Sequence, residues 1–301
     1  MRYKFAEIIE AVAKKDKKIV FMTGDLGFHA FEKLRNNLGR RFINAGVAEH
    51  NMVTAAAGMA YAGLKPWIYS IAPFVSIKVL EEIRNDICLP NFNVKIVALG
   101  GGYDYGIAGP THHALSDIAA IMTLPNIKIY TPGIGGDMPE LVTRIYNERG
   151  PAYLRLTKAE SVDIKLSSYA PVRRLLKGEK ITVVVLGSMV NRVIPACLRF
   201  KSKPIDVWMI SELPFELPKG LIESIKKTQL VCVVEEHVNT GGLGHYFQHL
   251  LFQNRVPLKN FIHLYAKGYV SKKYGSRDFY LKESGLDEEN IVKTLSSLVK
   301  T

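Results

Sequence analysis

Glu49 is an acidic residue at the predicted start of a helix, where a carboxyl group can do chemistry. Glu49 lies within Asn44–Gly58, where an alanine-rich stretch predicts a helix that begins near Ala48. A carboxyl group in that place serves as a general acid or base if it is buried next to a substrate or cofactor. The structural alternative is a carboxylate in the first turn of the helix, where the helix dipole stabilises it. The residue types alone leave both interpretations open.

Two glycine-rich loops follow apolar segments, as phosphate-binding loops do. Gly24–Gly27 (GDLG) lacks both the GxGxxG pattern and the lysine of GxxxxGK[ST], so its nucleotide signature is weak. Gly241–Gly244 precedes a predicted helix, whose N-terminus can receive an anion. A tight strand-to-helix turn is the simpler interpretation of the second loop.

The histidines and cysteines outside these segments do not predict a metal site. His237, His245 and His249 have no Cys or carboxylate at ligand spacing, and the 3 cysteines are far apart without a CxxC pair. Such cysteine usage favours a reducing compartment. The longest clean apolar run, Ile181–Leu186, is far shorter than the ~20 residues that cross a membrane. We therefore expect a cytoplasmic protein without a membrane segment.

The charge is unusual for a chain of ordinary composition. Of its 301 residues, 48% are hydrophobic and 23% charged, which excludes a disordered chain, and the formal net charge is +12. The basic residues occur in pairs such as Lys14-Lys15 and Arg40-Arg41, without interleaved aromatic residues. This pattern favours a solvated surface and an acidic protein partner over nucleic-acid binding.

Short apolar segments alternate with helical patterns along the whole chain. This alternation predicts parallel βαβ units, with functional residues at the carboxyl ends of the strands. The predicted strands are Lys18–Thr23, Arg41–Asn44, Trp67–Ile71, Val94–Leu99, Ile127–Tyr130, Ala152–Leu156, Ile181–Leu186, Ile205–Trp208, Leu230–Glu235 and Phe261–Tyr265. The periodicity is lost over 157–178, so we predict an α/β fold of two doubly wound domains, 1–160 and 179–301, with a linker at 161–178.

Five segments resemble, in the family's order, the transketolase family of thiamine-diphosphate enzymes. They are NAGVAEHNMVTAAAG at 44–58, SIAPFVSIKVLEEIRND at 70–86, GPTHHALSDIAAIMTLPNIKIYTPG at 109–133, PAYLRL at 151–156 and VCVVEEHVNTGGLG at 231–244. The resemblance spans about residues 5–255 and implies a pyrimidine-binding domain followed by the family's C-terminal domain.

The resemblance also implies a set of site residues. Glu49 would meet N1′ of the cofactor's aminopyrimidine, Phe74 would stack on that ring, and His112, which follows GPT, would face the substrate. Arg155 of PAYLRL would contact a sugar phosphate. His113 stands where transketolases often have Gln, and it would line the same entrance.

The segment with Asp25 and His29 approaches the active site across the subunit interface in this family. The resemblance therefore makes Asp25 a candidate for cofactor binding and His29 a candidate for substrate binding.

The implied chemistry explains why these residue types are needed. Thiamine diphosphate reacts through the C2 carbanion of its thiazolium, while the protein supplies orientation and electrostatics. A carboxyl group bonded to N1′ promotes the imino tautomer, so Glu49 is expected to be buried and to exchange a proton, which Gln could not do. Phe74 would hold the ring by stacking worth about 1 kcal/mol. His112 would polarise the donor carbonyl or pass a proton to an alkoxide.

Departures from the family pattern define the expected assembly. The GDG…NN motif that holds the Mg²⁺-diphosphate is absent, because Leu26 replaces its last Gly and Asn36-Asn37 follow too soon. The chain then corresponds to one part of a split enzyme, without a metal site of its own. An N-terminal partner subunit would bind the diphosphate and Mg²⁺ or Ca²⁺, and self-association would give a heterotetramer with two copies of each chain.

A second departure concerns the substrate. Many transketolases have an Asp before GPTH that contacts a donor hydroxyl, whereas this chain has Ala108. The preceding segment also lacks a second substrate histidine. The sugar or sugar-phosphate donor is therefore expected to be atypical, or Tyr103, Asp104 or Tyr105 takes over the contact.

We interpret the chain as the C-terminal subunit of a two-chain transketolase that transfers a two-carbon ketol unit from a ketose to an aldehyde. The main alternative is the β subunit of a 2-oxo acid dehydrogenase, although GPTHHALSD at 109–117 speaks against it. A second alternative is a non-catalytic α/β scaffold in which Glu49 is only a carboxylate at the start of a helix. Nucleic-acid binding is the third and weakest.

Overall fold

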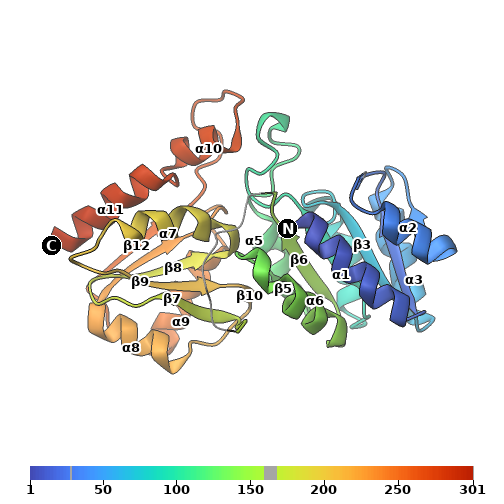
Figure 1. Ribbon diagram of the computed structural model, residues 1–301, viewed down its shortest axis with the longest axis horizontal. Coiled ribbons are helices and arrows are strands. Elements are labelled where there is room, and N and C mark those ends of the chain that lie inside the picture. Colours follow the sequence, from blue (N-terminus) through green and yellow to red (C-terminus); the bar gives the residue numbers. More distant parts are fainter. Residues whose placement is uncertain (28, 159–167, 301) are drawn as a thin grey trace.

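The chain forms two mostly parallel sheets, which lie at the right and the left of Figure 1. The computed structural model describes residues 1–27, 29–158 and 168–300. Helices cover both faces of each sheet, so the predicted α/β class with two doubly wound units is confirmed. The first part of the predicted linker, 161–167, lies outside the described residues, and its second part contains a strand.

The first sheet has the strand order β10-β5-β6-β4-β3-β1-β2. Its strands are β1 (Ile19–Thr23), β2 (Phe42–Asn44), β3 (Lys65–Ile71), β4 (Lys95–Leu99), β5 (Lys128–Tyr130), β6 (Ala152–Leu156) and β10 (Glu212–Leu213). Every residue of β1, β4 and β6 is buried, as expected for parallel strands that are covered on both faces. The carboxyl ends of β1, β3, β4 and β6 consequently meet at one edge of this sheet.

Except for the short α4 (Leu80–Glu82), which has no buried residue, the helices of this half bury one face each against the sheet. The helices are α1 (Arg2–Lys15), α2 (Glu32–Leu38), α3 (Glu49–Tyr61), α4 (Leu80–Glu82), α5 (Asp117–Met122) and α6 (Met138–Asn147). Apolar residues of α1, α2 and α6 share one core cluster with buried residues on one face of the strands, and α3 and α5 contribute to a second cluster on the opposite face. The spacing of these apolar residues is the physical reason that the sequence predicts most of these helices.

The sequence pattern over about Val75–Ile87 predicts a helix, but the segment after β3 is irregular. The chain makes a 3-10 turn at Ile77–Val79, the short α4, and a π-helical segment at Ile83–Cys88. Ile83, Ile87 and Cys88 are all fully buried in this segment. Wider π turns occur often next to functional sites. Here the irregular segment begins just after Phe74 and carries Lys78.

The second sheet has the strand order β12-β11-β8-β9-β7. Its strands are β7 (Val172–Leu176), β8 (Thr182–Leu186), β9 (Asp206–Ile210), β11 (Leu230–Val234) and β12 (Asn260–Leu264), and its helices are α7 (Val190–Leu198), α8 (Lys219–Thr228), α9 (Leu243–Gln253), α10 (Arg277–Ser284) and α11 (Glu288–Lys300). The strand β7 lies in the segment that was expected to be a linker and pairs antiparallel with β9. Among the described helices, none is both long and apolar enough to cross a membrane.

The two sheets are tied together by a strand and by a buried charge cluster. Strand β10 follows β9 in the chain, yet it pairs antiparallel with β5 of the first sheet. Near α10, the Glu236 carboxylate accepts hydrogen bonds from the Tyr103 amide at 2.9 Å and from Arg277 Nη2 at 2.6 Å. Arg277 also lies 3.2 Å from Asp104, whose pKa is raised by burial. Through Tyr103 and Asp104, the loop after β4 is therefore bonded to the second half of the chain.

Lys95, at the start of β4, is a buried lysine that is 3% exposed. Its Nζ donates to the carbonyl oxygens of Glu148 at 3.0 Å and Gly150 at 2.8 Å, just after the C-terminal end of α6. Burial lowers the pKa of Lys95 to about 8, because desolvation disfavours the charged amine.

This burial predicts a pH-dependent stability. Between about pH 8 and pH 10 the unfolded chain keeps the Lys95 proton that the folded chain has released, so the contribution of Lys95 to the free energy of unfolding rises with pH, by up to about 3 kcal/mol. Urea unfolding across this range is therefore expected to show the wild type gaining stability relative to Lys95→Met as the pH rises. Lys17→Met, at an exposed lysine, is expected to follow the pH dependence of the wild type. A difference between wild type and Lys95→Met that stays constant with pH would contradict the assignment.

Candidate active site

Glu49 is a buried carboxylate at the edge of the sheet where the strands end. It is the first residue of α3 and is 2% exposed, facing Gly24 after β1 and Ser70 within β3. Its Oε1 lies 3.4 Å from Ser70 Oγ, and its Oε2 accepts a hydrogen bond of 2.9 Å from Lys78 Nζ. A Cβ on Gly24 would lie 3.3 Å from both Oε1 and Ser70 Oγ, so the glycine keeps this corner open.

Phe74 and His112 extend the same site. Their ring centroids are 5.4 Å apart in an edge-on arrangement, and Lys78 Nζ lies 5.6 Å from the centroid of the Phe74 ring. The Nδ1 atom of His112 is 2.9 Å from Thr111 Oγ1. Glu49, Lys78, Phe74 and His112 thus form a continuous chain of contacts, which we call the Glu49 cluster. Three of its members were predicted from the sequence, and Lys78 was missed.

Tyr105 lies next to this cluster, whereas the other two candidates near Ala108 do not. The Tyr105 ring centroid is 5.7 Å from that of His112, with Lys158 Nζ 4.2 Å from the Tyr105 centroid. Tyr103 is fully buried and bonded to Gly268, and Asp104 pairs with Arg277. Of the three, the geometry therefore leaves Tyr105 as the residue near His112.

His113 points away from its neighbour His112 and into the contact between the two halves of the chain. It is 5% exposed, with Nε2 2.9 Å from the Gly106 carbonyl oxygen and Nδ1 3.1 Å from Tyr269 Oη. Burial lowers the pKa of His113 and favours its neutral form. A substrate contact by His113 stays a prediction; in this structure both ring nitrogens face protein atoms.

Arg155 is bonded inside the protein rather than directed into the Glu49 cluster. Its Nε donates to Asp117 Oδ2 at 2.8 Å, and its Nη2 donates to the carbonyl oxygen of Ala114 at 2.7 Å. Arg155 is 6% exposed and Asp117 is fully buried. The predicted contact with a sugar phosphate stays a prediction, while the observed contacts are those of a buried ion pair.

Asp25 and His29 lie in the loop between β1 and α2. Both have positive φ angles, of 52° and 64°, and both are exposed. The Asp25 amide donates to Asn44 Oδ1 at 3.0 Å, and Asn44 Nδ2 donates back to Asp25 Oδ1 at 3.0 Å. The His29 amide bonds to the carboxylate of Glu32. Neither residue has a described contact with the Glu49 cluster, so their roles at a subunit interface stay predictions.

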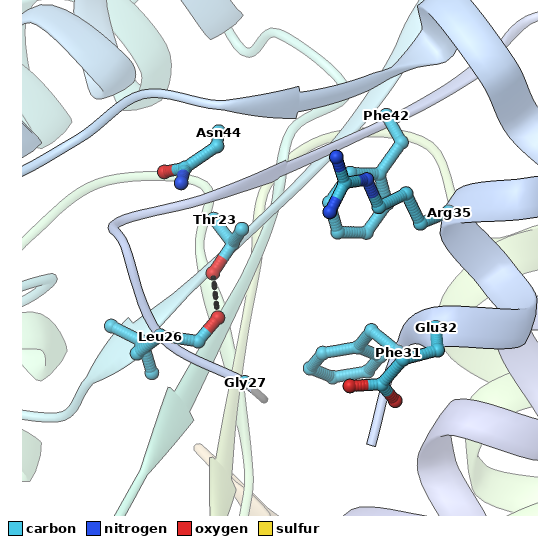
Figure 2. A pocket seen from close by; sticks show the side chains of 8 residues that line it. All are labelled: Thr23, Leu26, Gly27, Phe31, Glu32, Arg35, Phe42 and Asn44. Carbon is cyan, nitrogen blue, oxygen red and sulfur yellow. Dashed lines mark hydrogen bonds between the residues drawn. The ribbon is translucent and has the colours of Figure 1, made fainter. Parts of the chain in front are cut away.

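A small pocket of about 180 Å³ opens beside this loop. Figure 2 shows the rings of Phe31 and Phe42 along one side, with the Arg35 side chain against Phe42 and Asn44 across from them. Its lining residues are Thr23, Leu26, Gly27, Phe31, Glu32, Arg35, Phe42 and Asn44. Asn44 connects the pocket to Asp25.

The second glycine loop, Gly241–Gly244, is filled by a side chain of the protein itself. The carboxylate of Glu235 accepts hydrogen bonds from the amides of Leu243 at 2.7 Å and Gly244 at 2.8 Å, at the N-terminus of α9. A Cβ on Gly242 would lie 2.4 Å from this carboxylate. The glycines thus let an internal carboxylate take the place that an anionic ligand would need, which supports the structural interpretation of the loop.

The described residues hold no cluster of His, Cys, Asp or Glu that is suitable for a metal ion. His237, for example, accepts a hydrogen bond from the Ala119 amide at 3.2 Å. All three cysteines are buried and free.

Comparison with known proteins places both halves of the chain. Residues 1–162 match the family "Transketolase, pyrimidine binding domain", and residues 170–291 match "Transketolase, C-terminal domain". A subunit of the apulose-4-phosphate transketolase of Actinobacillus succinogenes is 31% identical over 86% of this chain and 85% of its own. The corresponding protein from Phocaeicola vulgatus is 29% identical over 99% and 97%.

Longer relatives and solved structures agree with this assignment. The 1-deoxy-D-xylulose-5-phosphate synthase of Clostridium perfringens is 28% identical over 98% of this chain, which spans only 48% of that protein. A solved structure described as a split gene transketolase, inactive beta4 tetramer, superposes with a TM-score of 0.85 and 26% identity, covering 99% of this chain and 98% of the other. The chain therefore belongs to the transketolase family, of which it comprises the pyrimidine-binding and C-terminal domains.

Proposed function

We propose that this chain is the C-terminal subunit of a two-chain, thiamine-diphosphate-dependent transketolase, and that the Glu49 cluster is its part of the active site. The observation that carries the proposal is the buried Glu49 carboxylate at the strand ends, in contact through Lys78 with Phe74 and His112. The relatives named as subunits of apulose-4-phosphate transketolase, which match over most of their length, support the two-chain arrangement.

The residues of the cluster fit the pyrimidine end of the cofactor. A buried carboxylate with one weakly engaged oxygen, Oε1, suits a partner nitrogen such as N1′, and the half-buried Phe74 ring offers an apolar face. When bound, thiamine diphosphate supplies the thiazolium carbanion chemistry. Glu49 holds and moves a proton at N1′, and Phe74 fixes the plane of the ring.

His112 is the proposed substrate-facing residue. It is half-buried between Phe74 and Tyr105, so one side of the imidazole is packed while the other remains reachable. An imidazole in this place can polarise a donor carbonyl or carry a proton to an alkoxide near neutral pH. We assign sugars or sugar phosphates as substrates. Many transketolases have an Asp before GPTH that contacts a donor hydroxyl, and we assign this contact to Tyr105 because the chain has Ala108 in place of the Asp.

The diphosphate and the divalent metal are assigned to the partner subunit. The described residues contain neither a metal cluster nor the GDG…NN motif. We therefore propose that an N-terminal subunit contributes the binding site for the diphosphate and for Mg²⁺ or Ca²⁺. Two copies of each chain assemble in this proposal. The proposed location is the cytoplasm, in keeping with the free cysteines.

The partner requirement is directly testable. The isolated chain is expected to show no thiamine-dependent turnover, because half of the cofactor site is missing. Co-expression with the product of the neighbouring gene is expected to yield a complex that retains thiamine diphosphate, detected by mass spectrometry, and that transfers ketol units. Turnover by the isolated chain would overturn the two-chain proposal, and a stable complex without cofactor would favour a scaffold.

A further inference from the structure

Lys78 brings a positive charge to the buried carboxylate of Glu49. Its Nζ lies 2.9 Å from Glu49 Oε2, and the two side chains are 42% and 2% exposed. The pair thus joins a buried anion to a cation that reaches in from the surface. A carboxylate buried this deeply is costly without a counter-charge, and Lys78 supplies one.

The two carboxylate oxygens of Glu49 are held unequally. Oε2 takes the charge-assisted bond from Lys78 at 2.9 Å, whereas Oε1 is 3.4 Å from Ser70 Oγ, which is long for a hydroxyl donor. Oε1 is therefore the oxygen that is open to a further donor. The ion pair fixes the carboxyl group through Oε2 and leaves Oε1 available to accept a hydrogen bond.

Other charged groups near Glu49 are engaged elsewhere. His50, the next residue of α3, pairs with Glu82 of α4. On the β1 side, Gly24 has no side chain and Asp25 is bonded to Asn44. Among the described residues, Lys78 is thus the cation in contact with the Glu49 carboxylate.

We propose, resting on the function proposed above, that Lys78 is a positioning residue for Glu49 in the transketolase reaction. It holds the carboxyl group through Oε2 and directs Oε1 to N1′ of the pyrimidine. Lys78 acts through Glu49 and does not itself bind the cofactor.

The first test measures the isolated chain, without any cofactor. In Lys78→Met the buried Glu49 carboxyl group loses its ion-pair partner, so the variant is expected to be less stable to urea than the wild type near pH 7. In the Glu49→Gln background there is no ion pair to lose, and Lys78→Met is expected to cost about half as much stability or less. An equal loss of stability in the two backgrounds would overturn the coupling.

The second test uses the reconstituted two-chain enzyme. The acid limb of the pH profile for proton–deuterium exchange at cofactor C2 is expected to move upward by about half a pH unit in Lys78→Met, an about threefold change in proton affinity for a partly exposed pair. Lys78→Arg is expected to restore the wild-type limb, and Lys219→Met, at an exposed lysine, to leave it unchanged. The dissociation constant of thiamine diphosphate is expected to change by less than about twofold, since Lys78 does not contact the cofactor.

Failure of this inference is distinguishable from failure of the proposed function. If Glu49→Gln stops C2 exchange while Lys78→Met leaves the acid limb in place, the active-site assignment stands and the role of Lys78 is wrong. If Lys78→Met weakens cofactor binding about tenfold or more, Lys78 binds the cofactor directly and the positioning role is overturned. If Glu49→Gln exchanges normally, the proposed function itself fails.

Discussion

Glu49→Ala in the reconstituted two-chain enzyme is expected to lower turnover by about 10²–10⁴-fold, the range that general acid–base catalysis contributes. The variant removes the group that holds a proton at N1′, so proton–deuterium exchange at cofactor C2 is expected to fall with turnover. Glu49→Gln keeps the shape and one hydrogen bond but cannot exchange a proton, and it is expected to lose as much exchange. Exchange is followed by NMR of the quenched cofactor.

The matched control for this prediction is Glu7→Gln, an exposed carboxylate on α1. It is expected to leave exchange and turnover unchanged. Urea unfolding of the isolated Glu49 variants separates a chemical effect from a folding defect, because the ion pair with Lys78 is also lost. Normal C2 exchange in a folded Glu49→Ala enzyme would show that the acid–base group has been assigned wrongly.

Arg155→Met is expected to destabilise the isolated chain by about 3–5 kcal/mol, because it leaves the fully buried Asp117 carboxylate without its cation. Tyr153 Oη, at 2.8 Å from Asp117 Oδ2, cannot compensate the charge. Adding Asp117→Asn to this variant removes the unpaired charge and is expected to recover part of the loss. The free energy of unfolding in urea is the measurement.

This experiment also decides between two roles for Arg155. A surface pair, broken by Arg199→Met, serves as the control and is expected to change stability little, since Arg199 and Glu289 are exposed. If Arg155→Met were as stable as wild type and instead raised the KM for a phosphorylated sugar, the predicted phosphate contact would be correct. The observed ion pair would then be secondary.

Much of the fold follows from local patterns. The buried strands β1, β4, β6 and β8 are mostly apolar, as parallel strands covered on both faces require, and the charged residues in them, Lys95 and Arg155, have partners inside the protein. Helix α3 begins at Glu49, as the alanine-rich segment predicts. The short α2, α10 and β10 were not predicted. Two residues of β10 carry no periodicity, and the partner strand β5 is more than eighty positions earlier in the chain.

The sequence by itself determined the fold class and the family, and it made Glu49, Phe74 and His112 candidate site residues, because these inferences depend on local periodicity and on contiguous motifs. Tertiary packing alone decided where the other charged groups point. Arg155 meets Asp117 because the first residue of α5 lies beside β6, and His113 meets Tyr269 because the two halves of the chain are in contact. Lys78 reaches Glu49 through an irregular turn that no helical pattern predicts. The partner of a side chain depends on which helices and strands pack together. The sequence of a single segment does not contain that information.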